Sequence, residues 1–196
     1  MKFLSRFSLL ILLAVILQQC THSRASNQAS QASNQVKPNS MDSNSNNPVY
    51  SRSDSSVVNL TDDQWKKILP GNVYTVARQK GTERPYSSPL EENHAIGMYY
   101  CAVCGNPLFK SDAKFDSSCG WPSFFEPVSK GSIIYLPDHS HGMERTEVEC
   151  GRCKSHLGHV FNDGPAPTGL RYCINGVVLD FESGQSPAGA QPAQGA

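Results

Sequence analysis

Two Cys-x-x-Cys motifs constrain this sequence more than any other feature. Cys101 and Cys104 follow one strand-like run, and Cys150 and Cys153 close another. A spacing of two residues lets both sulfurs of a pair face one point across a tight turn, and two such pairs are typical of a closed tetrahedral zinc site. Because the pairs lie far apart in the sequence, we predict that a zinc ion held by these four cysteines clamps two β-layers together.

Three other interpretations of these cysteines remain open from the residues alone. An exported protein can use four cysteines as structural disulfides. One motif can be a redox pair, although neither has a WCGPC context or a βαβ setting. Cys150, Cys153, His156 and His159 can form a local cluster, although zinc fingers separate their two ligand pairs by a long spacer. The spacing favours the four-cysteine site.

Residues 1–25 have the composition of an export leader. Lys2 and Arg6 precede an apolar run from Phe7 to Leu17, which is shorter than the roughly 20 residues of a membrane span. Ser23-Arg24-Ala25 suits ordinary signal cleavage, whereas Cys20 is placed where a lipoprotein carries its lipid. We predict a periplasmic or secreted protein, with a membrane-anchored lipoprotein as the alternative.

The folded domain is predicted to span residues 57–185. Residues 26–56 are rich in Ser, Asn and Gln and predict a disordered linker, and residues 186–196 predict a disordered tail. The formal net charge of +0 at pH 7 shows no electrostatic footprint for nucleic acid. No long apolar edge or heptad repeat is evident, which favours a monomer.

The pattern within the domain predicts a mainly β fold with a short N-terminal helix. Thr61 and Gln64 form a capping box that opens a helix over residues 61–69, and Pro70-Gly71 ends it. Strand-like runs follow, separated by turn formers, at residues 97–103, 132–137, 146–150, 157–161 and 171–181. No long helical period interrupts them, so the strands are predicted to pair antiparallel.

Cys119 and Cys173 are the two cysteines of the domain outside the paired motifs. Cys173 lies in a predicted strand, whose alternation places Arg171, Cys173 and Asn175 on one face. Cys173 can be a packing residue, half of a disulfide or a reactive thiol. Tyr172 and Ile174 already supply the buried face of this strand, and a neighbouring guanidinium lowers the pKa of a thiol. The pattern therefore favours a reactive thiol.

Four long segments in this order resemble one enzyme family. They read GTERPYSSPL, YCAVCGNPLF, CGWPSFFEP and CGRCKSHLGHVFNDGPAPTGLRYCIN. Together they resemble the B-type peptide-methionine (R)-S-oxide reductases from about Leu60 to about Phe181. The resemblance implies a fold of two antiparallel β-sheets with a structural zinc. One departure is Gly176, where family members commonly have serine.

The resemblance also implies a reaction and a role for each residue. Cys173 matches the thiolate that attacks the sulfur of methionine sulfoxide and becomes a sulfenic acid, and Cys119 matches the cysteine that resolves it to a disulfide. A thioredoxin-like dithiol then restores both thiols of this protein-repair oxidoreductase. His156 and His159 match histidines that assist proton delivery, and Trp121 matches a contact to the substrate methyl group. The remaining expectations are that Asn175 bonds the oxygen or thiolate, Arg171 favours the thiolate, and Asp163 holds an imidazole or a water.

Two other function classes compete with this one. A binding module would form an aromatic cage from Trp121, Phe124 and Phe125, but a cage needs no unpaired cysteines. A general disulfide oxidoreductase would need a reactive Cys-x-x-Cys pair, which a closed zinc site excludes. We therefore expect oxidised proteins or peptides as substrates and a thioredoxin-like protein as reductant.

Overall fold

A computed structural model describes residues 47–184. The predicted leader, the first part of the predicted linker (residues 26–46) and the predicted tail at residues 186–196 lie outside this described part. Among the described residues, no helix has both the length and the apolar character needed to cross a membrane.

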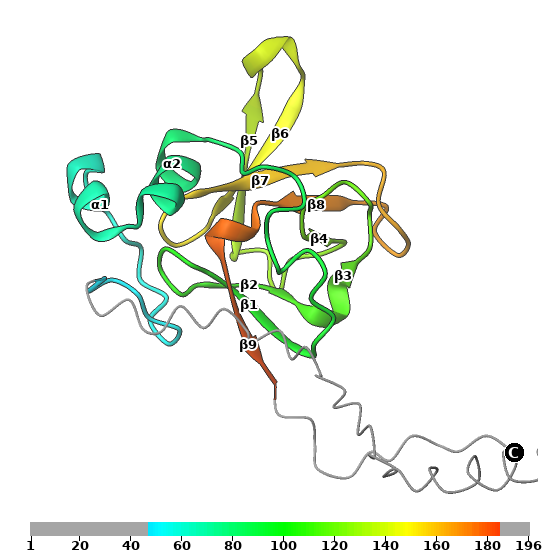
Figure 1. Cartoon of the computed structure of the whole chain (residues 1–196), viewed down its shortest axis with the longest axis horizontal. Coiled ribbons are helices and arrows are strands. Elements are labelled where there is room, and N and C mark those ends of the chain that lie inside the picture. Colours follow the sequence, from blue (N-terminus) through cyan, green and yellow to red (C-terminus); the bar gives the residue numbers. More distant parts are fainter. Residues whose placement is uncertain (1–46, 185–196) are drawn as a thin grey trace, which may run out of the picture. The chain divides into compact units, whose positions relative to one another are not determined.

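The domain is mainly β and contains two antiparallel sheets, as predicted (Figure 1). The three-stranded sheet has the order β2-β1-β9 and the six-stranded sheet the order β3-β4-β8-β7-β6-β5. The strands of the first sheet are β1 (Gly97–Cys101), β2 (Pro107–Lys110) and β9 (Leu179–Ser183). Those of the second are β3 (Lys114–Phe115), β4 (Ser123–Phe124), β5 (Ile133–Asp138), β6 (Arg145–Cys150), β7 (His156–Phe161) and β8 (Arg171–Ile174). Single 3₁₀ turns form at η1 (Ser111–Ala113), η2 (Ser140–Gly142) and η3 (Gly176–Val178).

In the described part of the chain two helices precede the sheets, whereas the sequence predicted one. Helix α1 (Asp62–Ile68) begins at the predicted capping box. Helix α2 (Gly71–Gln79) begins directly after Pro70, which ends α1 but is compatible with a helix start because that position needs no N–H donor. Val73, Val76 and Ala77 recur on one face of α2 and are buried. The prediction of a stop at Pro70-Gly71 was right for α1 and missed the helix that follows.

An aromatic cluster between the sheets fixes the position of strands β4 and β8. The rings of Phe109 and Phe124 stack with centroids 4.3 Å apart, and Tyr99 meets Phe124 edge-on at 4.9 Å. Tyr172 and Ile174 of β8 are buried on the core side, as the alternation predicted. The other side of β8 is therefore left for Cys173. Because Phe124 is fully buried in this core, it is unavailable for an aromatic cage.

Residues 47–56, which the sequence placed in the linker, pack on both Cys-x-x-Cys turns. The Asn47 side chain donates to the carbonyl of Val103 at 2.8 Å, and the Ser51 N–H donates to the carbonyl of Cys104 at 3.0 Å. Arg152, inside the second motif, is buried and donates to the carbonyls of Cys104 and Ser56. Polar composition suggested a tether, but here the polar groups bond to backbone that the tight turns leave unpaired.

We expect Arg152→Met to lower the free energy of unfolding by about 3 kcal/mol, because it removes the hydrogen bonds by which one buried side chain joins the second Cys-x-x-Cys turn to residues 49–56. Chemical denaturation of the folded, metal-loaded chain measures this change. Lys130→Met is the matched control, since Lys130 is an exposed cation near the same turn. A loss no larger than that of the control would show that the contacts of residues 47–56 contribute little.

Candidate active site

The chemistry-bearing side chains lie in one row across the six-stranded sheet. Leu136 of β5 pairs with Glu147 of β6, and Glu147 pairs with His159 of β7. His159 pairs in turn with Cys173 of β8, and Cys173 pairs with Ser123 of β4. Directly paired residues point to the same side of a sheet. The register therefore brings Glu147, His159 and Cys173 onto one face.

A β-bulge explains how two histidines three residues apart share this face. The register of β7 against β6 shifts between His156 and Gly158, so β7 carries one extra residue there. In a regular strand, residues at an odd spacing point to opposite faces of the sheet, but one extra bulge residue between them puts both on the same face. The rings of His156 and His159 lie 5.5 Å apart at 66°. The motif HLGH thus provides two adjacent imidazoles in spite of its spacing.

Cys119 and Cys173 form a close thiol pair. Their sulfurs are 3.6 Å apart, and both residues are partly exposed. Cys119 lies in the loop before β4, next to Gly120, whose φ of +91° suits glycine. The hydroxyls of Ser117 and Ser123 lie 2.9 Å and 3.4 Å from the Cys119 sulfur. The two cysteines are not bonded to each other, and a modest approach of their sulfurs would allow a disulfide bond to form.

The short contact between the two sulfurs shifts the pKa values of the two thiols in opposite directions. The hydrogen bond from Cys173, together with the Ser117 and Ser123 hydroxyls, lowers the pKa of Cys119 to about 4. The same contact and burial raise the pKa of Cys173, and Arg171 opposes this rise without cancelling it. The prediction that Arg171 lowers the pKa of Cys173 has the right direction, but Cys119 outweighs it. At neutral pH the pair holds one proton and one negative charge.

A cavity of about 140 Å³ opens on Cys173. Its lining includes Trp121, His159, Phe161, Cys173 and Asn175. The Trp121 indole is held in place by donating to the carbonyl of Glu83 at 3.3 Å. Cys119 does not line this cavity, so a ligand inside it meets the Cys173 sulfur. A larger cavity of about 560 Å³ lies beside α2 and contains neither thiol nor imidazole in its lining.

Asn175 lines the cavity, but its amide bonds to backbone. Its Nδ2 donates to the carbonyl of Leu157 at 2.9 Å, and its Oδ1 accepts from the N–H of Glu83 at 3.0 Å. These bonds hold the loop that carries Glu83 against β7. Asn175 therefore positions the cavity wall in this structure.

Arg171 and Asp163 form a two-point ion pair. The guanidinium donates to both carboxylate oxygens at 2.9 Å and 2.8 Å, and it lies over the ring of Phe161 at 4.5 Å. The arginine lowers the pKa of Asp163. Asp163 therefore contacts the cation beside the thiols and holds neither histidine.

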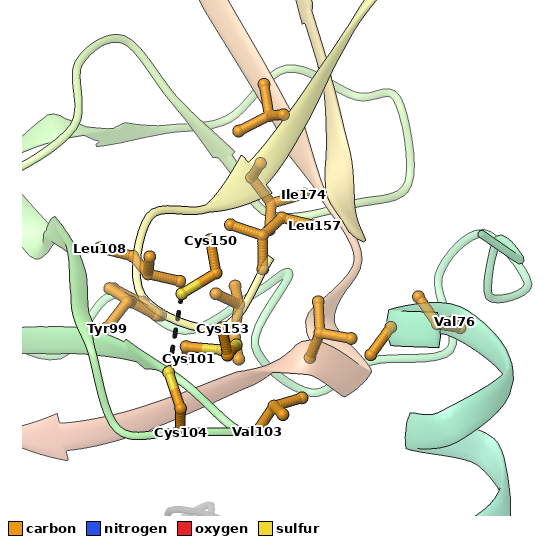
Figure 2. Close-up of a cluster of buried hydrophobic side chains, with 14 of the residues drawn as sticks. Val76, Tyr99, Cys101, Val103, Cys104, Leu108, Cys150, Cys153, Leu157 and Ile174 are labelled. Carbon is orange, nitrogen blue, oxygen red and sulfur yellow. Dashed lines mark hydrogen bonds between the residues drawn. The ribbon is translucent and has the colours of Figure 1, made fainter. Parts of the chain in front are cut away.

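The other four cysteines within residues 47–184 form a separate buried cluster (Figure 2). Their sulfurs all lie within 4.8 Å of one another. Cys101 and Cys153 are 3.7 Å apart, and Cys104 and Cys150 are 3.6 Å apart. Tetrahedral zinc with bonds of about 2.3 Å separates its sulfurs by about 3.8 Å. The cluster fits a metal ion of this kind, and the local cluster with His156 and His159 does not form.

Comparison with known proteins places this site in a family. The SelR domain matches residues 69–183. A peptide methionine sulfoxide reductase MsrB of Pseudomonas fluorescens is 55% identical over 119 residues, which cover 61% of this chain and 92% of the relative. The MsrB of Leptospira interrogans is 54% identical over 125 residues, covering 64% and 95%. That of Bradyrhizobium diazoefficiens is 56% identical over 122 residues, covering 62% and 88%.

The chain belongs to the MsrB family of peptide methionine sulfoxide reductases. It is therefore an oxidoreductase that acts on methionine sulfoxide. The four clustered cysteines outside the thiol pair are positioned to hold a metal ion.

Sequence reasoning missed the carboxylates that hold the two histidines of this MsrB chain. His159 Nε2 lies 2.7 Å from Asp138, which Arg145 also contacts at 2.7 Å. His156 Nδ1 lies 2.7 Å from Glu147. Both acids lie on the β5–β6 hairpin. Alternation along TEVEC marks Glu147 and Glu149 as one face of a strand, but only the register shows which histidine each meets.

Gly176, where the family resemblance led us to expect serine, lies in a crowded position. A Cβ at position 176 would collide with the side chain of Ser88. The backbone N–H groups of Gly176 and Val177 both donate to the Glu83 carboxylate. In this chain Ser88 occupies the space that a side chain at 176 would need, and the turn after Cys173 is held by Glu83.

Proposed function

We propose that this MsrB chain reduces methionine-(R)-sulfoxide in oxidised proteins and peptides, with Cys173 as nucleophile and Cys119 as resolving cysteine. The observation that carries the proposal is the thiol pair: two sulfurs at 3.6 Å, of which Cys173 alone lines the cavity. The choice of the R epimer comes from the B-type resemblance.

The proposed reaction has three balanced steps. The Cys173 sulfur attacks the sulfoxide sulfur, oxygen passes to Cys173 with one proton, and methionine leaves with the electron pair of the broken S–O bond. The resulting sulfenic acid is attacked by the Cys119 sulfur, which forms a disulfide and releases water. A thioredoxin-like dithiol then reduces the disulfide by exchange and is itself oxidised. The proton shared within the pair reaches Cys119 as Cys173 becomes the nucleophile.

The side chains around the cavity have distinct proposed tasks. His159, held by Asp138, and the adjacent His156 supply or relay the proton to the sulfoxide oxygen. Trp121 faces the substrate methyl group as an apolar wall. Arg171, fixed by Asp163, stabilises the negative charge of the thiol pair. Asn175 forms a further part of the cavity wall.

The proposal includes a structural zinc ion, an export route and a monomeric state. The four-cysteine site would close the coordination shell of zinc, so a metal there would stabilise the fold and take no part in the reaction. Export, with or without a lipid tether at Cys20, rests on residues outside the described part. A thioredoxin-like protein in the same compartment would then serve as reductant.

The test of the proposed function is turnover of resolved epimers. The purified chain with dithiothreitol should reduce the R epimer of a peptide methionine sulfoxide and leave the S epimer unchanged. Chromatographic measurement of the methionine formed decides between them. Turnover of the S epimer alone would contradict the proposal.

We expect Cys119→Ser to form about one methionine per enzyme and then stop when a thioredoxin-like protein is the only reductant. The first step needs only Cys173, whereas recycling needs the disulfide. Rapid-quench measurement of methionine, with a dimedone-type trap for the sulfenic acid, measures this burst. Continued turnover at the wild-type rate would remove Cys119 from the recycling path.

A further inference from the structure

Glu147 is a buried carboxylate held between a histidine and a lysine. One oxygen lies 2.7 Å from His156 Nδ1, and the other lies 2.7 Å from Lys80 Nζ. The side chains of His156 and Glu147 are only 3% and 4% exposed. Lys80 reaches them from the C-cap of α2, where its backbone is left-handed with φ of 55°. Helix α2, which the sequence did not predict, therefore has as its C-cap the lysine that pairs with Glu147.

The charges in this group determine which nitrogen of His156 carries hydrogen. An ionised carboxylate only accepts hydrogen bonds, so Nδ1 must donate to Glu147. Burial lowers the pKa of His156, which keeps the ring neutral. In a neutral ring with hydrogen on Nδ1, Nε2 is an acceptor. This atom is buried and has no hydrogen-bond partner among the described residues.

Lys80 supplies the positive charge that pairs with the buried Glu147 carboxylate. A buried carboxylate without a partner charge takes up a proton and can then donate as well as accept. Glu149 also lies 3.5 Å from Lys80, so this ammonium faces two acidic groups. Removing Lys80 leaves both carboxylates without this partner.

We propose that Lys80 and Glu147 are positioning residues that lock His156 in the tautomer with hydrogen on Nδ1. The locked ring presents Nε2 as an acceptor next to His159. It thereby holds a water or a transferring proton beside the imidazole that lines the cavity. The kinetic consequence rests on the proposed reductase reaction, whereas the tautomer itself does not.

The direct test is ¹⁵N NMR of the reduced, metal-loaded chain labelled at histidine, without substrate. Wild-type His156 should show a protonated Nδ1 and a bare Nε2. In Glu147→Gln the amide can donate or accept, so both tautomers should appear. Lys80→Met should shift the ring in the same direction, and Lys80→Arg should restore the wild-type signals. Lys67→Met, an exposed lysine of α1, is the matched control.

The same variants have a kinetic readout. Glu147→Gln and Lys80→Met should lower kcat for the R sulfoxide by about 10- to 100-fold with little change in KM, as expected when a residue that orients a histidine is lost. Lys80→Arg should recover most of the rate. Lys80 is 57% exposed, so Lys80→Met tests the idea even where Glu147→Gln fails to fold.

A wild-type ring protonated on Nε2 would overturn the inference. So would Lys80→Met with unchanged NMR signals and the kcat of Lys67→Met. If the wild type fails to reduce sulfoxide but shows the expected tautomer, the proposed function fails and the positioning by Lys80 and Glu147 stands.

Discussion

Cys173→Ser should abolish reduction of methionine sulfoxide. A serine hydroxyl stays protonated at neutral pH and is a far weaker nucleophile than a thiolate, so the loss of rate should be on the order of 10⁴-fold or more. The variant keeps the size of the side chain and leaves the core face of β8, formed by Tyr172 and Ile174, unchanged. We therefore expect a folded enzyme with wild-type metal content. Methionine formation from the R epimer with dithiothreitol measures the effect.

Cys119→Ser is the matched control for this substitution. It removes the other sulfur of the same pair, 3.6 Å away, yet it should still form methionine in the first turnover. The two variants thus separate the attack on sulfoxide from the recycling of the enzyme. Single-turnover activity in Cys173→Ser, or none in Cys119→Ser, would exchange the roles of the two cysteines. This outcome matters because Cys119 is the more acidic thiol of the resting pair.

Local patterns predicted the longer strands and the strand that carries Cys173, but they missed the short strands β2, β3 and β4. The predicted run over residues 171–181 divides into β8 and β9, which belong to different sheets. Alternation along RYCI placed Cys173 opposite the buried Tyr172 and Ile174, and the structure confirms this. The Cys-x-x-Cys spacing predicted the cluster of four sulfurs, because the constraint lies within two short turns. Helix α2 was missed because its apolar residues are few and Pro70 suggested an end. The contacts of residues 47–56 were missed because a polar composition does not reveal backbone partners.

The partners of the two histidines depend on the register of the sheet and were beyond sequence reasoning. Asp138 meets His159 across the β5–β6 hairpin, and Glu147 meets His156 across the β6–β7 pair. A bulge in β7 brings His156 to the face of Glu147, and the regular register beyond it places His159. A shift of one residue in that register would turn every side chain to the other face. Asp163 was the nearest acid in the motif, yet it bonds to Arg171. Proximity in sequence was therefore misleading for the acid–histidine pairs.

The cysteine cluster connects the parts of the fold that position the active site. Cys101 ends β1 of the three-stranded sheet, and Cys150 ends β6 of the six-stranded sheet. Cys153 lies just before β7, the strand that carries His156 and His159. Figure 2 shows the four cysteines gathered among core side chains such as Leu108 and Leu157. A metal at this point would join the two sheets and hold the start of β7.

Cys104→Ser should therefore unfold the domain rather than only slow the enzyme. A four-thiolate zinc site contributes about 10 kcal/mol or more to folding, which is comparable to the whole stability of a domain. We expect the purified wild type to hold about one zinc per chain by mass spectrometry. Cys104→Ser should lose this metal, its near-ultraviolet circular dichroism and a cooperative thermal transition.

Cys119→Ser again provides the control, since it removes a cysteine outside the cluster and should keep both metal and fold. A strong chelator added to the wild type should reproduce the effect of Cys104→Ser, because both remove the same cross-link between the sheets. A metal-free chain that keeps its cooperative transition and its turnover of the R epimer would show that core packing alone holds β7 in place. In that case Asp138 and Glu147, and not the metal, would hold the two histidines in position.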